Sequence, residues 1–366
     1  MFIHQRKDWP KFSWDKERTL RLLAEIRYLQ GKLLGKMQNL GFDLQDQAVL
    51  ETITLDVVKN SEIEGEMMNT DEVRSSVARK LGIKLESEIH VGRYTDGVVE
   101  MMLDATQNYS MDLTDERIFG WHAALFPTGR SGMYKISVGA WRQGEEPMQV
   151  VSGFMGKETV HYEAPHSKDL VMEMDRFIQW TKSDQKLDDI IKAAIAHFWF
   201  VTIHPFDDGN GRVTRAITDM FLSRSDASKQ RFYSMSAAIL KNKKGYYNIL
   251  EKTQKGDVDI TEWIMWFLNC LMEAINSSEN KLAAILCKAR FWNTFLETKL
   301  NDRQKLMINK LLDGFDGKLR TGKWAKITKC TEKTALRDIE DLIEKKILKK
   351  GSAGGRSTSY ELISDR

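Results

Sequence analysis

The sequence HPFDDGNGRVTR at residues 204–215 constrains this chain more than any other stretch. An apolar segment, AAIAHFWFVTI, precedes it at residues 193–203, and AITDMFLSR continues it in helical form. Gly and Asn at residues 209–211 tolerate positive φ, so successive backbone N–H groups can line one concavity. The following helix adds its unpaired N–H groups and the positive end of its dipole. A buried helix, a polar loop and a helix N-terminus together predict an anion-binding site.

Charged side chains strengthen this prediction. Arg212 and Arg215 lie three residues apart on one helix face, and helical side chains lean toward the N-terminus, so both can reach the turn. Cations are disfavoured at a helix N-terminus, so we expect a bound polyanion, or an acidic side chain in its place. Asp208 could hold Mg²⁺, which favours one or two carboxylates plus phosphate oxygens. His204 is suited to act as a general base near neutral pH.

At every defined position this stretch resembles the Fic family motif, H-x-F-x-(D/E)-G-N-G-R-x-x-R. Fic proteins transfer a nucleotide monophosphate, usually AMP from ATP, to a protein hydroxyl. The resemblance implies that His204 deprotonates a target Ser, Thr or Tyr, and that Asp208 binds Mg²⁺. The related Doc kinases have Ala and Lys where this chain has Gly209 and Gly211, which favours nucleotidyl transfer over phosphorylation. The implied contacts to the nucleotide phosphates are Gly209, Asn210, Gly211, Arg212 and Arg215.

A second stretch, KNSEIEGEM, places three glutamates, Glu62, Glu64 and Glu66, at the C-terminal end of a helix expected at residues 44–60. The helix dipole disfavours acidic groups at that end. Gly65 is suited to cap the helix. Acids at this end of a helix break a local rule, which marks the stretch as a candidate functional segment, while a solvated acidic helix end is the alternative.

The same stretch resembles the inhibitory motif of Fic proteins, (S/T)-x-x-x-E-(G/N), with Glu64 as its glutamate. The resemblance implies that Glu64 pairs with Arg215 and excludes a productive γ-phosphate. The chain departs from the motif at the first position, where Asn60 stands in place of Ser or Thr. Because an Asn side chain can replace one hydroxyl hydrogen bond, Glu64 remains the expected inhibitory residue.

Residues 133–165 are rich in glycine, and MQVVSGF and ETVHYEA form two short β-like runs around a turn. We expect a hairpin here. In Fic proteins a hairpin flap ahead of the motif pairs with the target segment through backbone hydrogen bonds. The resemblance makes Val150, Val151 and Ser152 the residues of the flap that dock the target.

Three further residues would line the adenine pocket by the same resemblance, namely Tyr246, Tyr247 and Gln254. Stacking on a base is a sound role for Tyr, although plain core residues would give the same pattern. His197 lies seven residues before His204 on a nearly identical helix face, and we expect a hydrogen-bonded core histidine there.

The C-terminal residues 301–366 carry 16 Lys and Arg against 10 Asp and Glu, a net charge of +6 in a chain of net charge +3. A helix is expected at 302–312, an extended segment at 323–328, a helix at 331–348, and then two strands around a Gly-rich tip. This order resembles a winged helix domain, with 331–343 as the recognition helix and Gly351–Gly355 as the wing. The basic charge permits DNA binding, but many winged helices bind protein instead. Residue types suited to DNA contacts are Thr331, Lys333, Thr334, Arg337 and Arg356.

We therefore predict a mainly α protein: a Fic-type helical bundle with a β-hairpin flap and a C-terminal winged helix domain. The expected domains are an N-terminal helical region with the inhibitory helix (1–110), a Fic catalytic domain (111–298) and the winged helix domain (299–366). The N-terminus has no apolar signal segment, no run of about 18 apolar residues occurs, and three scattered cysteines form no C-x-x-C pair. We expect a cytoplasmic protein without a membrane segment.

The predicted function is that of a protein adenylyltransferase that uses ATP and Mg²⁺ and is inhibited by its own Glu64. Removal of AMP from a modified protein, with Glu64 activating water, is an alternative. A DNA-binding regulator that senses nucleotide without turnover is another. The expected partner is a protein with a target hydroxyl, and we also consider DNA, through residues 300–366, and a second copy of the chain.

Overall fold

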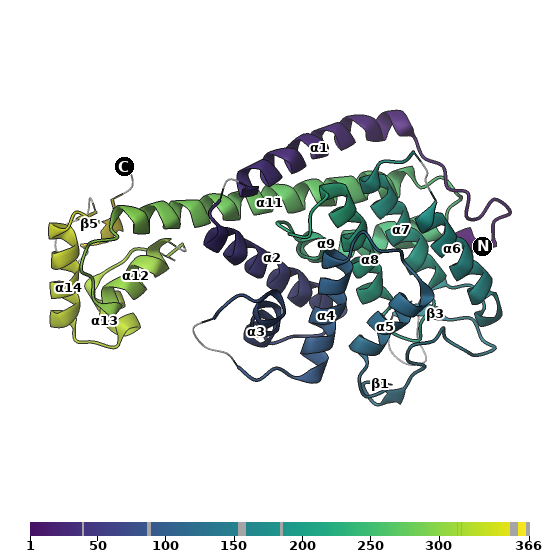
Figure 1. Ribbon diagram of the computed structural model, residues 1–366, viewed down its shortest axis with the longest axis horizontal. Helices are drawn as coiled ribbons and strands as arrows, with labels where there is room; N and C mark the ends of the chain where they lie inside the picture. Colours follow the sequence, from purple (N-terminus) through teal and green to yellow (C-terminus); the bar gives the residue numbers. More distant parts are fainter. Residues whose placement is uncertain are drawn as a thin grey trace. The chain divides into compact units, whose positions relative to one another are not determined.

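Figure 1 shows a mainly α-helical chain, as predicted. This computed structural model describes residues 1–38, 40–85, 89–152, 159–183, 186–312, 314–315, 317–351 and 358–363. The helices are α1 (Lys16–Gln38), α2 (Phe42–Ile63), α3 (Thr70–Leu81), α4 (Arg93–Gln107), α5 (Asp115–Leu125), α6 (Leu170–Lys182), α7 (Asp189–Ile203), α8 (Asn210–Asp226), α9 (Met235–Lys241), α10 (Lys243–Gln254), α11 (Thr261–Thr294), α12 (Asp302–Leu312), α13 (Thr321–Thr328) and α14 (Glu332–Glu344). The strands are β1 (Arg130–Ser131), β2 (Tyr134–Lys135), β3 (Gln149–Ser152), β4 (Thr159–Glu163), β5 (Leu348–Lys350) and β6 (Tyr360–Leu362), and the 3₁₀ turns are η1 (Ile3–Gln5) and η2 (Ser167–Asp169).

The chain divides into two compact units, Met1–Glu279 and Asn280–Arg366. The division falls within α11, whereas the sequence prediction placed its last boundary at 298/299, after this helix. The predicted domain limits at 110/111 and 298/299 stay a prediction. Each unit is described by itself below.

Helix α7 forms the centre of the larger unit. Residues 190–203 are all buried, which explains why the sequence there is apolar on every side of the helix. The side chain of Asp188 caps its start by accepting a hydrogen bond from the Ile190 N–H at 2.8 Å. Helix α8 packs along α7, and α2, α4 and α5 all contact α8. The motif loop at 204–209 therefore joins the two most central helices.

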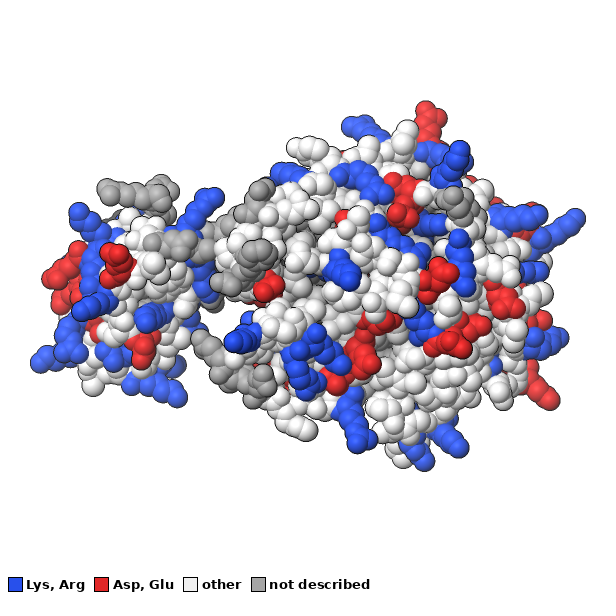
Figure 2. Space-filling model, viewed as in Figure 1, with Lys and Arg blue, Asp and Glu red and all other residues white. Residues whose placement is uncertain are grey.

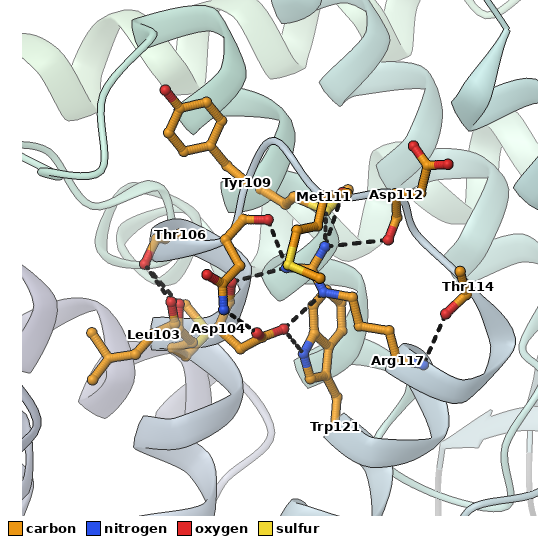
Figure 3. Close-up of polar contacts among 12 residues, drawn as sticks. Leu103, Asp104, Thr106, Tyr109, Met111, Asp112, Thr114, Arg117 and Trp121 are labelled. Atoms are coloured by element: carbon orange, nitrogen blue, oxygen red, sulfur yellow. Dashed lines mark hydrogen bonds and ion pairs between the residues drawn. The ribbon is translucent and has the colours of Figure 1, made fainter.

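Helix α5 is fixed against α4 by a polar cluster that Figure 3 shows in close-up. The Asp104 carboxylate accepts hydrogen bonds from Arg117 Nε at 2.8 Å and from Trp121 Nε1 at 2.7 Å. Arg117 also donates to backbone carbonyls of the connection between the helices, including that of Met111 at 3.0 Å. Burial opposes ionisation of Asp104, but hydrogen bonds from Asn108, Arg117 and Trp121, together with the Arg117 charge, hold its pKa below the ordinary value. The cluster thus sets the position of α5.

The hairpins each pair two antiparallel strands: β1 with β2, β3 with β4, and β5 with β6. The expected hairpin is confirmed as β3–β4, while its role as a flap stays a prediction. Its register pairs Val150 with Tyr162 and Val151 with Val160, and a bulge lies between Val150 and Val151. The turn of this hairpin, residues 153–158, lies outside the described residues.

In the smaller unit, α12, α13, α14 and the β5–β6 hairpin enclose a core of their own. The expected extended segment at 323–328 is wrong, because α13 covers these residues. Trp324 and Ile327 stand three residues apart, which is a helical spacing, and Trp324 is fully buried in this core. The order of helices followed by a hairpin agrees with the expectation, while the winged helix assignment stays a prediction. Residues 352–355 of the expected wing, and Arg356 after it, lie outside the described residues.

We predict that Asp104→Ala lowers the free energy of unfolding by about 2 kcal/mol, because it leaves two partly buried donors unpaired. Urea denaturation followed by circular dichroism would measure this. Asp112→Ala is the matched control, since the Asp112 side chain is 67% exposed and lies 3.9 Å from its cationic partner, Lys182. Equal losses for the two variants would contradict the role assigned to Asp104.

Candidate functional site

The motif loop has left-handed backbone at both ends. His204 (φ 53°) follows the last residue of α7, and Gly209 (φ 84°) precedes the first residue of α8. Between them, Asn210 holds the loop through Phe206: its Oδ1 accepts from the Phe206 N–H at 2.9 Å and its Nδ2 donates to the Phe206 carbonyl at 2.8 Å. The Asn210 side chain is thus committed to the shape of the loop. Its expected contact to nucleotide phosphates stays a prediction.

His204 is held as a neutral imidazole. Its Nδ1 lies 3.2 Å from the Val201 carbonyl, which can only accept, so Nδ1 carries the proton and Nε2 carries the lone pair. Burial lowers the pKa of His204 to about 4, although the carboxylates of Glu64 and Asp208 act in the opposite direction. The ring is therefore unprotonated at neutral pH and able to accept a proton at Nε2.

Two residues that sequence reasoning did not assign to the site hold the motif loop from outside. Arg142 donates from Nε to the His204 carbonyl and from its backbone N–H to the Pro205 carbonyl, both at 2.8 Å. His122 donates from Nε2 to the Asp208 carbonyl at 3.1 Å and stacks on Phe206 with 3.9 Å between ring centroids. Burial lowers the pKa of His122 to about 4, so it too stays neutral. Arg142 gives no local sequence signal, because its partners lie about 60 residues away.

Asp208, the expected Mg²⁺ ligand, lies at the edge of the site with its side chain 40% exposed. One carboxylate oxygen accepts from the Ser131 hydroxyl, and the other faces the Gly209 N–H at 2.5 Å and Arg212 Nη2 at 3.3 Å. No group of three or more metal-ligating side chains occurs within the part of the chain described. One oriented carboxylate suits Mg²⁺, which takes its remaining ligands from phosphate oxygens and water. The residues present therefore fit a metal that binds together with a nucleotide.

Arg215 is 1% exposed and is held by the end of α2. Its Nε donates to Asn60 Oδ1 at 2.5 Å, and its Nη2 donates to the Asn60 carbonyl at 3.0 Å and to Glu64 Oε1 at 2.7 Å. Asn60 thus supplies a hydrogen bond with its amide oxygen, at the position where the Fic motif has a hydroxyl. The chain brings Glu64 and Arg215 together as the sequence predicted.

The Glu64 carboxylate also covers Gly211, the last residue of the Gly-Asn-Gly turn at 209–211, whose expected anion-binding concavity we call the nest. A Cβ at Gly211 would come within 2.0 Å of Glu64 Oε1 and 3.1 Å of Arg215 Nη1. The carboxylate therefore sits directly over the first turn of α8, where unpaired N–H groups and the dipole attract an anion. An acidic side chain of the chain itself occupies the predicted anion position.

Arg212 is also 1% exposed, and it has a carboxylate partner that the sequence did not predict. Its Nη1 lies 2.9 Å from Glu66 Oε2 and 3.1 Å from the Tyr94 hydroxyl. The guanidinium also lies over the Phe126 ring, 5.0 Å from its centroid. Glu66 drew notice in the sequence as a misplaced acid, but no spacing rule linked it to Arg212.

The three expected adenine-pocket residues differ in their surroundings. Tyr246 is 2% exposed and its hydroxyl lies 2.8 Å from His197 Nε2, while buried Gln254 donates to the Thr202 hydroxyl at 3.3 Å. These two side chains thus hold α10 against α7. Tyr247 is 40% exposed and its hydroxyl donates to the carbonyl of Ile63, the last residue of α2, at 3.4 Å. A role in adenine binding stays a prediction for all three.

His197 is the core histidine that the sequence predicted. Its Nδ1 lies 2.8 Å from the Thr218 hydroxyl, so both ring nitrogens have partners, and the side chain is fully buried. In the flap, Val151 is 47% exposed on β3, and docking of a target by Val150, Val151 and Ser152 stays a prediction.

Comparison with known proteins matches two segments of the chain to family models. Residues 112–222 match the model of the Fic/DOC family, and residues 2–83 match that of a domain of unknown function (DUF4172). Two proteins named protein adenylyltransferase Fic, from Drosophila grimshawi and Drosophila mojavensis, are each 34% identical over 96 residues, which are 26% of this chain. Those 96 residues cover 19% and 18% of the two relatives, so the chain spans less than a fifth of their length.

Solved structures share the fold. A Fic family protein from Desulfovibrio desulfuricans has a TM-score of 0.51 at 16% identity, covering 94% of this chain and 97% of that one. A Fic domain containing signaling protein from Bacteroides thetaiotaomicron also has a TM-score of 0.51, at 18% identity, covering 72% and 96%. With the matched model and the complete motif, residues 112–222 form a domain of the Fic/DOC family. Among its described residues, no helix has both the length and the hydrophobicity to cross a bilayer.

We predict that the free energy of unfolding falls as the pH is lowered from 6.5 to 5. Burial lowers the pKa of His122 and His204 to about 4 and that of His197 to about 3. In the unfolded chain these residues titrate near pH 6.5. Between the two values the unfolded state binds more protons, so stability rises with pH in this window and is lost on acidification.

Urea denaturation at pH 7, 6 and 5 would test this. The window lies above the ordinary pKa values of carboxylic acids. Burial raises the pKa of Asp219 well above that range, which acts in the opposite direction, so the expected loss of stability is the net effect of the histidines over this group. A free energy of unfolding that is unchanged or higher at pH 5 would contradict that net loss.

Proposed function

We propose that this chain is a protein adenylyltransferase that transfers AMP from ATP to a Ser, Thr or Tyr hydroxyl of a target protein, and that Glu64 holds it inactive at rest. The observation that carries the proposal is the pairing of Arg215 with Glu64 directly over Gly211 in the nest. At the other end of the same loop, the neutral His204 ring has Nδ1 bonded to a carbonyl and Nε2 able to accept a proton. Proteins named protein adenylyltransferase match part of the chain, which supports the same reaction.

The proposed reaction begins when a target hydroxyl gives its proton to Nε2 of His204. The hydroxyl oxygen attacks the α-phosphorus of ATP, the bond from that phosphorus to the bridging oxygen breaks, and pyrophosphate leaves with the electron pair. The first turn of α8, Arg212 and Arg215 would stabilise the charge on the phosphates, which is the main contribution a protein makes to transfer at phosphorus. Held by Asp208, Mg²⁺ would neutralise further phosphate charge. His204 then returns its proton to solvent.

Two glycines support nucleotidyl transfer over phosphorylation. Gly209 has positive φ, and a Cβ there would meet Phe126 Cε2 at 2.9 Å. At Gly211 any side chain would enter the space over the nest. The Ala and Lys of Doc-type kinases therefore do not fit these positions without rearrangement.

The target would dock by adding a strand to the flap, whose exposed Val151 lies on β3. For location we propose the cytoplasm, because Cys270, Cys287 and Cys330 are all free thiols.

We predict that Glu64→Gln transfers label from α-³²P-ATP to protein, itself included, at least about tenfold faster than the unaltered chain. Loss of the negative charge frees Arg215 for phosphate while the shape of residue 64 is kept. Adding His204→Ala to this variant should abolish labelling, because Nε2 of His204 is the group that takes the proton in the proposed reaction. Autoradiography after electrophoresis measures both effects.

A parallel reaction with γ-³²P-ATP is the control for phosphorylation. Label retained from the γ position, or no label in Glu64→Gln from either nucleotide, would sink the proposal. Thermal melts of each variant establish that it is folded.

Removal of AMP is a second enzymatic candidate, favoured by the position of Glu64 at the nest, where its carboxylate could activate water. A pre-modified target separates the two directions. Loss of AMP mass that requires Glu64 would support removal, whereas loss of the same mass by Glu64→Gln would exclude Glu64 as the base.

A nucleotide-sensing DNA-binding regulator is the candidate from another class. The C-terminal unit has an open hollow lined by Lys318, Arg320 and Lys323, which supports phosphate contacts. Lys and Arg side chains are interspersed with acidic ones over its visible face (Figure 2), and α14 exposes Glu340 and Glu344. Gel retardation of DNA by the full chain that weakens steeply from 50 to 200 mM salt would support this candidate.

A further inference from the structure

The first arginine of the motif, Arg212, has its own set of contacts, separate from the pairing of Arg215 with Glu64. Arg212 Nη1 faces Glu66 Oε2 and the Tyr94 hydroxyl, and Arg212 Nη2 faces Asp208. Tyr94, at the start of α4, in turn donates its hydroxyl proton to Glu66. Glu66, Tyr94 and Arg212 thus form a closed triangle of hydrogen bonds, which we call the Arg212 lock.

The chain geometry explains how two carboxylates reach two arginines. Gly65 has φ 86°, a left-handed conformation that ends α2, and the N–H groups of Glu64 and Glu66 both donate to the Ser61 carbonyl, at 3.0 and 3.1 Å. The tight turn around Gly65 therefore presents Glu64 to Arg215 and Glu66 to Arg212. Both pairs belong to one turn, but each uses a different carboxylate and a different arginine.

Each of the two arginines has one buried N–H donor group without a hydrogen-bond partner in the part of the chain described. Among the described residues, Arg212 Nε and Arg215 Nη1 are buried and have no hydrogen-bond partner. An unsatisfied buried donor is costly, and here it belongs in each case to a guanidinium that is 1% exposed. Two such donors at the first turns of α8 indicate a ligand with several acceptor oxygens, as a phosphate chain has.

The carboxylates at the site and a polyphosphate ligand would compete for the same two arginines, because both are negatively charged. The two arginines face three carboxylates, those of Glu64, Glu66 and Asp208, so the site is already neutralised by the chain itself. A polyphosphate entering beside Glu66 would meet like charge at close range. If only Glu64 left, Glu66 would still occupy Nη1 of Arg212.

We propose, building on the function proposed above, that Glu66 held by Tyr94 is a second inhibitory contact, which keeps Arg212 from the nucleotide phosphates and opens separately from the Glu64–Arg215 pair. Burial raises the pKa of Tyr94 to about 12, so its hydroxyl remains a donor to Glu66 at all ordinary pH values. Both glutamates lie in residues 2–83, the segment that matches a domain of unknown function, so in this chain that segment would inhibit the site.

The opposite role for Glu66 is to orient Arg212 so that it binds phosphate better. The two roles differ in sign. An inhibitory Glu66 weakens nucleotide binding, so its removal tightens binding, whereas an orienting Glu66 improves binding, so its removal weakens it.

The test measures binding of α,β-methylene ATP with Mg²⁺ by calorimetry, because this nucleotide cannot be cleaved at the bond that the reaction breaks. We expect Glu66→Gln to lower the Kd by about fivefold, and Tyr94→Phe to lower it by a smaller factor, since Glu66 then loses its donor. Glu64→Gln with Glu66→Gln should bind more tightly than either single variant, and should label protein faster from α-³²P-ATP than Glu64→Gln alone.

Glu62→Gln is the matched control. Glu62 lies on the same turn, but its carboxylate pairs with Lys59 at 2.5 Å and touches neither arginine, so its Kd should equal that of the unaltered chain. An unchanged or higher Kd for Glu66→Gln, or slower labelling by the double variant than by Glu64→Gln, would overturn the second contact.

Failure of this inference is distinguishable from failure of the proposed function. Tighter binding in Glu66→Gln without any transfer of AMP would keep the Arg212 lock and remove the adenylyltransferase. Transfer by Glu64→Gln with no change in the Kd of Glu66→Gln would do the reverse.

Discussion

Two buried guanidinium groups at the positive end of α8 are the constraint on which the rest of this site depends. Arg212 and Arg215 are each 1% exposed, they point toward a helix dipole of the same sign, and they stand close to one another. Burying cations in such a place is costly unless anions accompany them. The chain supplies those anions from α2, and this requirement ties α2 to α8 across about 150 residues of sequence.

The same constraint explains why α2 ends as it does. Glutamates flank the left-handed Gly65 on both sides, where the helix dipole disfavours acidic groups that have no cationic partner. Here Glu64 and Glu66 each meet an arginine, and Asn60 adds both its side-chain and its backbone oxygen to Arg215. Under the proposed function, the stability of the inactive form and access for a nucleotide would oppose each other, because Glu64 and Glu66 already hold the arginines that the phosphates would need.

Sequence patterns predicted the residues of the motif loop and of the first turns of α8, but not the residues that contact them from distant segments. The twelve-residue motif gave His204, Asp208 and both arginines because all lie in one loop and one helix turn, where spacing fixes relative position. Glu64 followed from a broken dipole rule and a family resemblance. Arg142, Tyr94 and the partner of Glu66 did not follow, because contacts between distant segments are set by packing, which no local spacing encodes. The extended segment expected at 323–328 failed for a related reason: six residues are too few to separate a helical from an alternating pattern.

The Asn210 side chain, joined at both ends to the backbone of Phe206, has a consequence for how the protein changes state. The loop takes its form from bonds within itself, with Arg142 and His122 bracing it from either side. Its geometry therefore exists before any ligand arrives, and the entropy of ordering it is spent during folding. Under the proposed function, the inactive and the active form would then differ in a few side chains around a fixed loop. Single substitutions in α2 would change the relative free energies of the two forms without altering the loop at residues 204–209.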